Sequence, residues 1–252
     1  MAGHSHAANI MYRKAAVDRK RAKIFSKLAR MITVAAKQGG GDPDGNPKLR
    51  LAMEKARVVS MPKDNIERAI KKGTGESEAG AFEEVLYEGY GPGGVAVMLE
   101  ALTDNRHRTA PEVRNLFAEY GGNLGATGAV AWMFERKAVF LVTAESGWTE
   151  DRLLETTLEI GAEDLIADDG AFEIRGEPAR FMELKAALEA RKVPLGAAEV
   201  AYVPKNKVQV TDVAVAKKVL ELLDALEDND DVQQVYANYE FPDDVAAKVP
   251  AP

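Results

Sequence analysis

Lysine and arginine side chains crowd one short stretch near the start of this 252-residue chain. Four of them fall at i, i+4, i+8 and i+11, a spacing that places them on one helix face: Arg19, Lys23, Lys27 and Arg30. Cations so arranged can follow a phosphate backbone and release its counterions, so we predict nucleic-acid contacts here. The predicted contacts of this stretch are Arg13, Lys14, Arg19, Lys20, Arg21, Lys23, Lys27 and Arg30. The alternative is a solvated helix face without a partner.

A second basic group lies in the segment Thr103-Asp-Asn-Arg-His-Arg-Thr109, between a predicted strand and a predicted helix. Arg106 and Arg108 are candidates to contact phosphate or to stack on bases. The alternative is a helix-capping turn, with Thr109 as the N-cap and Glu112 completing a capping box. Both interpretations stay open, because a cap would also fix the loop that presents the two arginines.

The charge of the chain is divided unevenly along its length. Of 33 Lys and Arg and 40 Asp and Glu residues, 17 and 6 lie in residues 1–75, which leaves 16 and 34 for the rest. The first part therefore carries a net charge of +11 and the second −18, within a total of −7. Such asymmetry is typical of a module that binds a polyanion, joined to a body that phosphate repels.

Several enzymatic chemistries are excluded or unsupported. The chain has no cysteine, so thiolate catalysis and cysteine-based zinc sites are impossible, and three histidines leave little for an acid–base constellation. Residues 89–94 match G-x-G-x-x-G, but they precede a predicted strand and do not open a helix. Trp132 and its neighbours are predicted to pack in the core. We expect no catalytic residue, no metal site, no cofactor, no small-molecule substrate and no enzymatic activity.

The sequence also predicts a cytoplasmic protein without a membrane segment. No stretch approaches the roughly 20 consecutive apolar residues of a transmembrane helix. The first residues lack the apolar core of a secretory signal. The absence of cysteine is consistent with a reducing compartment.

Three helices are expected in the basic part. Apolar residues recur with helical spacing over residues 16–37, and Gly39 to Gly41 end that pattern. Asn46 is a predicted N-cap and Pro47 suits the first turn of a second helix, which runs to residue 59. A third, short helix follows from Pro62 to residue 73. Three helices with narrow apolar stripes can form a small bundle, and residues 1–75 are predicted to be this domain.

The remainder alternates strands and helices. Strands are predicted at 95–102, 129–134, 138–143, 164–167, 171–174, 198–203, 208–210 and 232–237, and helices at 111–120, 150–160, 178–190 and 213–226. The elements from 138 to 203 follow the order β-α-β-β-α-β of a ferredoxin-like unit. Those on either side, joined together, repeat that order. The predicted fold is therefore α+β: an N-terminal three-helix domain and two ferredoxin-like α/β domains, one inserted in the other.

The predicted domain boundaries follow from this nesting. The middle domain is discontinuous and comprises residues 76–135 and 205–240, and residues 136–204 form the inserted domain. Residues 241–252 are predicted to be a flexible tail.

Several long motifs, in order along nearly the whole chain, resemble the YebC/PmpR family. They are Ala2-Gly-His-Ser5, Ala8-Asn-Ile10, Arg13-Lys-Ala15, Gly39-Gly-Gly-Asp-Pro43, Asn46-Pro47, Met61-Pro-Lys-Asp-Asn-Ile-Glu-Arg-Ala-Ile-Lys-Lys-Gly-Thr-Gly75, Tyr87-Glu-Gly-Tyr-Gly-Pro-Gly-Gly94, Thr103-Asp-Asn-Arg106, Gly121-Gly-Asn-Leu-Gly125 and Trp132-Met-Phe134.

The resemblance implies a three-domain protein with a helical N-terminal domain and two α/β domains, one inserted in the other. Members are labelled probable transcriptional regulators that bind DNA. Related members, including a mitochondrial translational activator, act at the ribosome and assist synthesis of difficult sequences such as proline runs. Bacterial members are cytoplasmic.

The chain departs from the family pattern at its start. Members commonly have Lys-Trp where this chain has His6-Ala7, and His-Arg-Lys where it has Tyr12-Arg13-Lys14. The absent tryptophan argues against a stacking role at that position. The basic residues that follow are intact.

Two functional hypotheses follow. In the first, the chain is a translation factor that binds ribosomal RNA through the basic helix; residues 2–14 order on binding, and Arg106 and Arg108 are secondary contacts. In the second, it is a DNA-binding transcriptional regulator whose basic helices enter a groove. Against the second, the sequence shows no dimer zipper and no set of base-reading side chains. The sequence leaves the choice between RNA and DNA open.

Overall fold

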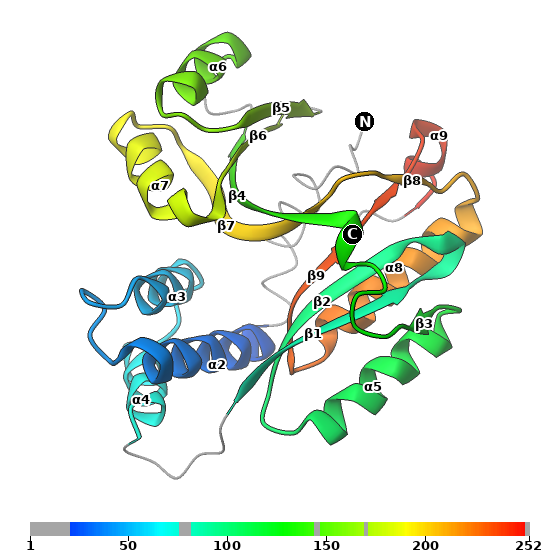
Figure 1. Cartoon of the computed structure of the whole chain (residues 1–252), viewed down its shortest axis with the longest axis horizontal. Helices are drawn as coiled ribbons and strands as arrows, with labels where there is room; N and C mark the ends of the chain where they lie inside the picture. The colour runs from blue at the N-terminus through cyan, green and yellow to red at the C-terminus, as the bar shows by residue number, and fades with distance from the viewer. Residues whose placement is uncertain (1–20, 76–81, 144–146, 169–170, 250–252) are drawn as a thin grey trace.

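The computed structural model describes residues 21–75, 82–143, 147–168 and 171–249 of the chain. A bundle of helices stands beside two sheets, each covered by helices on its outer face (Figure 1). The helices of the bundle are α2 (Arg21–Gly39), α3 (Pro47–Val58) and α4 (Lys63–Gly73). The prediction of three helices in the basic part is confirmed.

The helical bundle has its own small core and precise caps. Ile32, Leu49 and Ala56 are buried at its centre. The Asn46 side chain accepts a hydrogen bond from the Leu49 amide at 3.1 Å and donates to the Ala35 carbonyl at 2.8 Å. This confirms the predicted N-cap and also ties α3 to the end of α2. At the other contact, a Cβ on Gly73 would lie 2.3 Å from the Thr33 carbonyl oxygen, so only glycine lets α4 approach α2 this closely.

The first sheet has the strand order β3-β1-β2-β9, and all its neighbours are antiparallel. Its strands are β1 (Glu83–Tyr90), β2 (Ala96–Thr103), β3 (Asn123–Leu124) and β9 (Val232–Ala237). Helices α5 (Arg106–Glu119) and α8 (Val213–Asp228) cover one face. Strands from both sides of residues 134–204 therefore pair in one sheet.

The second sheet is built entirely from residues 134–204 and has the order β5-β6-β4-β7. Its elements are β4 (Phe134–Thr143), α6 (Glu150–Glu159), β5 (Asp164–Asp168), β6 (Ala171–Gly176), α7 (Phe181–Ala190) and β7 (Leu195–Pro204). Neighbouring strands are antiparallel. This is the split β-α-β arrangement predicted for the unit.

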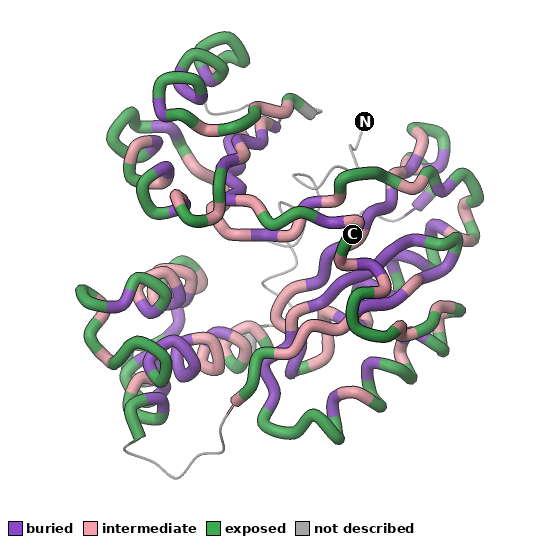
Figure 2. Tube along the Cα trace, in the orientation of Figure 1, coloured by how far each residue is buried: buried purple, intermediate pink, exposed green. Residues whose placement is uncertain are grey.

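The two sheets pack face to face, which gives four layers in the order helices, sheet, sheet, helices. Along β2, Val97 and Leu99 point to α5 and α8, whereas Ala96 and Met98 pack against Val139 and its neighbours on the second sheet. Both faces of β2 are therefore buried, as Figure 2 shows for the centre of the molecule. This explains why its sequence is a continuous apolar run and not an alternating one.

One predicted strand of the first sheet is wrong, and one strand was not predicted. Residues 129–133 form no strand: a turn and a short 3₁₀ helix (Ala131–Met133) lead directly into β4, which begins at Phe134. The strand that was not predicted is β1. The short strand β8 (Val208–Gln209) lies outside both four-stranded sheets and pairs in parallel with β10 (Tyr239–Glu240). The first unit thus still forms an antiparallel sheet with two helices, but some of its strands differ from those predicted.

The predicted flexible tail is wrong for residues 241–249. Phe241, Val245 and Val249 are buried in the core beneath α8, and a short helix, α9 (Asp243–Ala246), holds Val245 inward. Burial of three large apolar side chains anchors the segment against fraying. The last three residues of the chain lie outside the described part.

Candidate nucleic-acid interface

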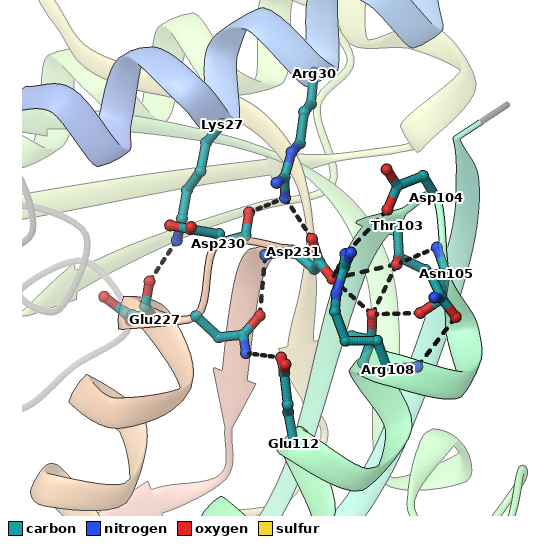
Figure 3. A network of polar contacts seen from close by, with 12 residues as sticks. Lys27, Arg30, Thr103, Asp104, Asn105, Arg108, Glu112, Glu227, Asp230 and Asp231 are labelled. Carbon is teal, nitrogen blue, oxygen red and sulfur yellow. Dashed lines mark hydrogen bonds and ion pairs between the residues drawn. The ribbon is translucent and has the colours of Figure 1, made fainter. Parts of the chain in front are cut away.

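The basic face of α2 lies against the C-terminal end of α8 (Figure 3). Lys23 Nζ donates to the Asp228 carbonyl at 3.2 Å and lies 3.7 Å from its carboxylate. Lys27 donates to the carbonyl of Glu227. Arg30 donates to the Asp230 carbonyl and, at 2.6 Å, to the carboxylate of Asp231. Three cations that were predicted to contact phosphate thus contact the protein's own backbone and carboxylates.

The end of a helix is a natural partner for cations. The last carbonyls of α8 lack partners within the helix, and the helix dipole places partial negative charge there. Lys23 and Lys27 satisfy two of these carbonyls from outside. We name this set of contacts, from Lys23, Lys27 and Arg30 to residues 227–231, the α2–α8 clasp.

Asp231 is the buried centre of the clasp. Its side chain is 3% exposed. One carboxylate oxygen accepts from Arg30, and the other accepts from Arg108 at 2.7 Å and Thr109 at 2.6 Å. Thr103 also donates to it, at 3.2 Å. The four donors come from three elements, so Asp231 joins α2, β2 and α5.

The surroundings of Asp231 keep it ionised. Burial alone raises the pKa of a carboxyl group, because the charged form loses water. Hydrogen bonds from Arg108 and Thr109, together with the charge of Arg30, outweigh burial and hold the pKa of Asp231 below its ordinary value. The negative charge that fixes both arginines is therefore present at neutral pH.

The second predicted basic group proves to be a helix start. Asn105, and not Thr109, is the N-cap of α5, since its side chain accepts from the Arg108 amide at 3.2 Å. Arg106 and Arg108 thus lie in the first helical turn. Arg106 is about half exposed and pairs with Glu83 at 2.8 Å. Arg108 binds Asp231 and Asp104, so its guanidinium group has a structural partner.

The other predicted contacts are not placed by the structure. Arg13, Lys14, Arg19 and Lys20 lie outside the described residues, as does the side chain of Arg21. The structure brings together Lys23, Lys27, Arg30 and Arg108 around residues 227–231 and leaves Arg106 apart from them.

The partner of the basic face was not predicted from the sequence, although a signal was present. Residues 227–231 read Glu-Asp-Asn-Asp-Asp, an acidic run directly after the apolar pattern of α8. Four acids at a helix C-terminus oppose the helix dipole and destabilise it unless cations arrive from elsewhere. That conflict points to a basic partner within the fold.

Exposed cations remain on the far helix of the bundle. Arg68, Lys71 and Lys72 lie at i, i+3 and i+4 on α4, opposite the buried Ile66 and Ala69. Among the described residues, none of the three cations forms an ion pair with a carboxylate; Lys72 lies 5.2 Å from the ring centroid of Phe82. We name Arg68, Lys71 and Lys72 the α4 basic face. Helix α4, which carries this face, lies beside α2 (Figure 1).

Trp132 is exposed, which contradicts its predicted place in the core. It is 64% exposed, and its indole N–H donates to the Ala129 carbonyl at 3.2 Å. The turn that carries it is held by Glu88, which is 2% exposed and accepts three backbone hydrogen bonds, from Gly128, Val130 and Ala131. A carboxylate in the core of the sheet therefore shapes this surface.

The described residues contain no group of three or more potential metal-binding His, Cys, Asp or Glu side chains. Among the same residues, no helix combines the length and hydropathy of a bilayer-spanning segment.

The fold defines the class: a small basic helical domain followed by two stacked α/β units with an acidic surplus. The chain belongs to the TACO1/YebC family. The model of the TACO1/YebC protein N-terminal domain matches residues 5–76, and the model of the TACO1/YebC second and third domain matches residues 82–239.

Relatives match over almost their full length. A protein of Halothermothrix orenii is 53% identical over 250 residues, covering 99% of each chain, and one of Persephonella marina is 52% identical, covering 99% of this chain and 100% of its own. Both are named probable transcriptional regulatory protein. The crystal structure of a conserved hypothetical protein, Aq1575, from Aquifex aeolicus is 51% identical, with a TM-score of 0.83 over 91% of this chain and 94% of that one.

Proposed function

We propose that this chain is a cytoplasmic, non-enzymatic regulator of gene expression that binds nucleic acid through its N-terminal helical domain, and that its partner is ribosomal RNA. The observation that supports this most is the charge of that domain. Residues 1–75 carry +11, and the α4 basic face stays exposed after the clasp contacts are made.

The α4 basic face has the geometry for a phosphate backbone. Three cations on one exposed helix face can each neutralise a phosphate and release a counterion. The proposed contacts outside the described residues, Arg13, Lys14, Arg19 and Lys20, add to the same domain, with Arg21 beside them. Arg106 is retained as a secondary contact because it is about half exposed. Arg108 is not retained, since Asp231 and Asp104 engage it.

The acidic remainder supports an oriented complex. Residues 76–252 carry a net charge of −18, so the two α/β units are repelled by the polyanion that the helical domain attracts. The molecule therefore approaches nucleic acid with the helical domain first.

The name probable transcriptional regulatory protein, which the relatives carry, favours a second candidate, a DNA-binding transcriptional regulator. The two candidates differ in sequence preference. A specific DNA regulator prefers its promoter over scrambled duplex by about a thousandfold or more. The proposed RNA-binding factor co-sediments with ribosomes, with a steep salt dependence, and shows no such promoter preference.

Reversing the charge of the α4 basic face is expected to weaken nucleic-acid binding sharply. The variant R68E/K71E/K72E loses three cation–phosphate contacts, so the slope of log K against log salt should fall by about two to three units. Fluorescence anisotropy with labelled single-stranded RNA and duplex DNA, over a salt series, measures this slope. The α4 core residues are untouched, so the variant should keep its circular dichroism spectrum and unfolding midpoint.

The matched control reverses the charge of three exposed lysines outside the helical domain: K205E/K217E/K218E. Both variants change the net charge by the same amount, so the control separates a local contact from a general charge effect. Equal losses in the two variants would refute the α4 basic face as an anchor.

A further inference from the structure

The cations of the α2–α8 clasp are the part of the basic domain with the best helical spacing for phosphate, yet each is already engaged within the protein. The side chain of Arg30 is 22% exposed and that of Lys23 is 46% exposed. Their partners lie in residues 227–231, which offer backbone carbonyls to all three cations and the carboxylates of Asp228 and Asp231. These groups are the protein's own counterparts of phosphate oxygens.

The helical domain is docked on the rest of the chain mainly by polar contacts. Its apolar core is a cluster of its own, although Leu51 of α3 packs against the core of the second sheet. Besides the clasp, Lys55 pairs with Glu199 at 3.4 Å, and Lys185 pairs with Glu54. Gln38 donates to Glu84 at 3.1 Å. Apart from the buried Arg30–Asp231 pair, these contacts are partly exposed, and contacts of that kind are individually weak and are screened by salt.

A cleft of about 570 Å³ separates the helical domain from the two sheets inside this ring of polar contacts. Its walls include Ile24 and Met31 of α2, Leu51 of α3, and Leu223 and Tyr239 on the opposite side. The interface is therefore not a continuous packed core, and separating the domains costs far less than breaking one.

We propose that the face of α2 formed by Lys23, Lys27 and Arg30 is a concealed binding surface for a sugar–phosphate backbone, and that nucleic acid and α8 compete for it. The inference rests on the proposed function and names how the same site is regulated. In the free chain the helical domain is docked and the face is closed. A polyanion that first binds the exposed α4 basic face draws the three cations from α8, and the helical domain separates from the sheets.

The competition has a clear electrostatic direction. Phosphates carry full charges, whereas the partners of Lys23 and Lys27 include backbone carbonyls and, for Lys23, a partly exposed carboxylate. Arg30, which Asp231 holds, is the cation that a phosphate must compete for hardest. Several phosphates in a row also act together, once the first contact has made the others intramolecular. By linkage, a change that weakens the clasp and leaves its cations intact strengthens nucleic-acid binding.

The chain has no cysteine, so two introduced cysteines report the domain separation directly. Asp44→Cys lies in the exposed turn between α2 and α3, and Glu221→Cys lies on the exposed side of α8. Spin labels at both sites give the distance distribution by double electron–electron resonance. We expect one narrow distance in the free full-length chain, and a longer, broader distribution on adding a 24-nucleotide single-stranded RNA.

A conservative variant that weakens the clasp also tests the competition. Asp228→Asn removes the carboxylate beside Lys23 and leaves every cation in place, so it is expected to tighten RNA binding about two- to fivefold. The matched control, Asp244→Asn, removes an exposed carboxylate far from the clasp and changes the net charge equally. It should change the affinity by much less.

The outcomes separate the two proposals. If RNA binds but the distance distribution stays narrow and Asp228→Asn binds no better than Asp244→Asn, the concealed surface is refuted and the proposed function stands. If the unmodified chain binds neither RNA nor duplex DNA at low salt, both are refuted. The competition is supported if the spin-label distance grows on adding RNA and if Asp228→Asn, but not Asp244→Asn, binds RNA more tightly.

Discussion

Replacing Asp231 with asparagine is expected to lower the free energy of unfolding by about 3 kcal/mol, the usual cost of removing one partner from a buried ion pair. The carboxylate accepts from Arg30, Arg108 and Thr109 while only 3% exposed. An amide of the same shape turns a donor toward these donors, removes the counter-charge beside Arg30 and leaves Arg108 with Asp104 alone. Urea unfolding followed by circular dichroism measures the loss.

A neighbouring residue provides the control. Asp230 is exposed and contributes only its backbone carbonyl to Arg30, so Asp230→Asn should change stability by no more than about 0.5 kcal/mol. A loss for Asp231→Asn no larger than for Asp230→Asn would show that the buried cluster does not hold α2, β2 and α5 together.

The free energy of unfolding should depend differently on pH in the unmodified chain and in Asp231→Asn, and the difference should lie in the acid range. The folded-state pKa of Asp231 lies below its ordinary value, so the unfolded chain takes up its proton first as the pH falls. The stabilisation is therefore complete above about pH 4, the ordinary pKa of aspartate, and is lost as the pH falls through the folded-state value. Asp231→Asn should lack this part of the acid sensitivity.

Replacing Glu88 with glutamine is expected to cost about 2 kcal/mol, because the carboxylate accepts three backbone N–H groups and an amide offers only one acceptor oxygen to them. The amide group of glutamine would also turn its own donor toward at least one of these N–H groups. Burial alone raises the pKa of Glu88, but the hydrogen bonds from Gly128, Val130 and Ala131 hold it below its ordinary value. The charge, and not only the shape, is thus required.

In Glu88→Gln, the turn that carries Trp132 should open more readily than the sheet does. Hydrogen exchange followed by mass spectrometry is expected to show faster exchange at residues 125–133 in Glu88→Gln. Glu84→Gln, an exposed change on the same strand, is the control and should leave this exchange unchanged. Equal exchange in both variants would show that Glu88 does not hold the turn.

The elements that local pattern determines were predictable from the sequence. The three helices of the bundle carry their own caps and stops, such as Asn46 and the glycines after α2, and they form where expected. The second sheet also follows its predicted order, because strands and helices alternate there with clear periodicity.

The errors around β1 share one physical cause. β1 contains glutamates and a glycine, so it does not read as a strand, and residues 129–134 are apolar enough to read as one. In the structure, the amides of 128, 130 and 131 donate to the Glu88 carboxylate and not to a neighbouring strand. A buried carboxylate that replaces a strand partner leaves no trace in hydrophobic periodicity.

The candidate site shows the limit of a charge pattern. Helical spacing identifies Lys23, Lys27 and Arg30 as one face, but it does not say whether phosphate or protein meets that face. The acidic residues 227–231 lie about 200 residues further along the chain, and only the packing of α8 against the sheet brings them to α2. Long-range partners of this kind require the tertiary fold.

Photocrosslinking tests most directly the claim that the basic helical domain, and not the acidic α/β units, holds the nucleic acid. Full-length chain bound to a 24-nucleotide RNA containing 4-thiouridine is irradiated, and the crosslinked peptides are mapped by mass spectrometry. We predict crosslinks within residues 1–75, including peptides from α4. Crosslinks concentrated in residues 134–204, with none in α4, would contradict the account.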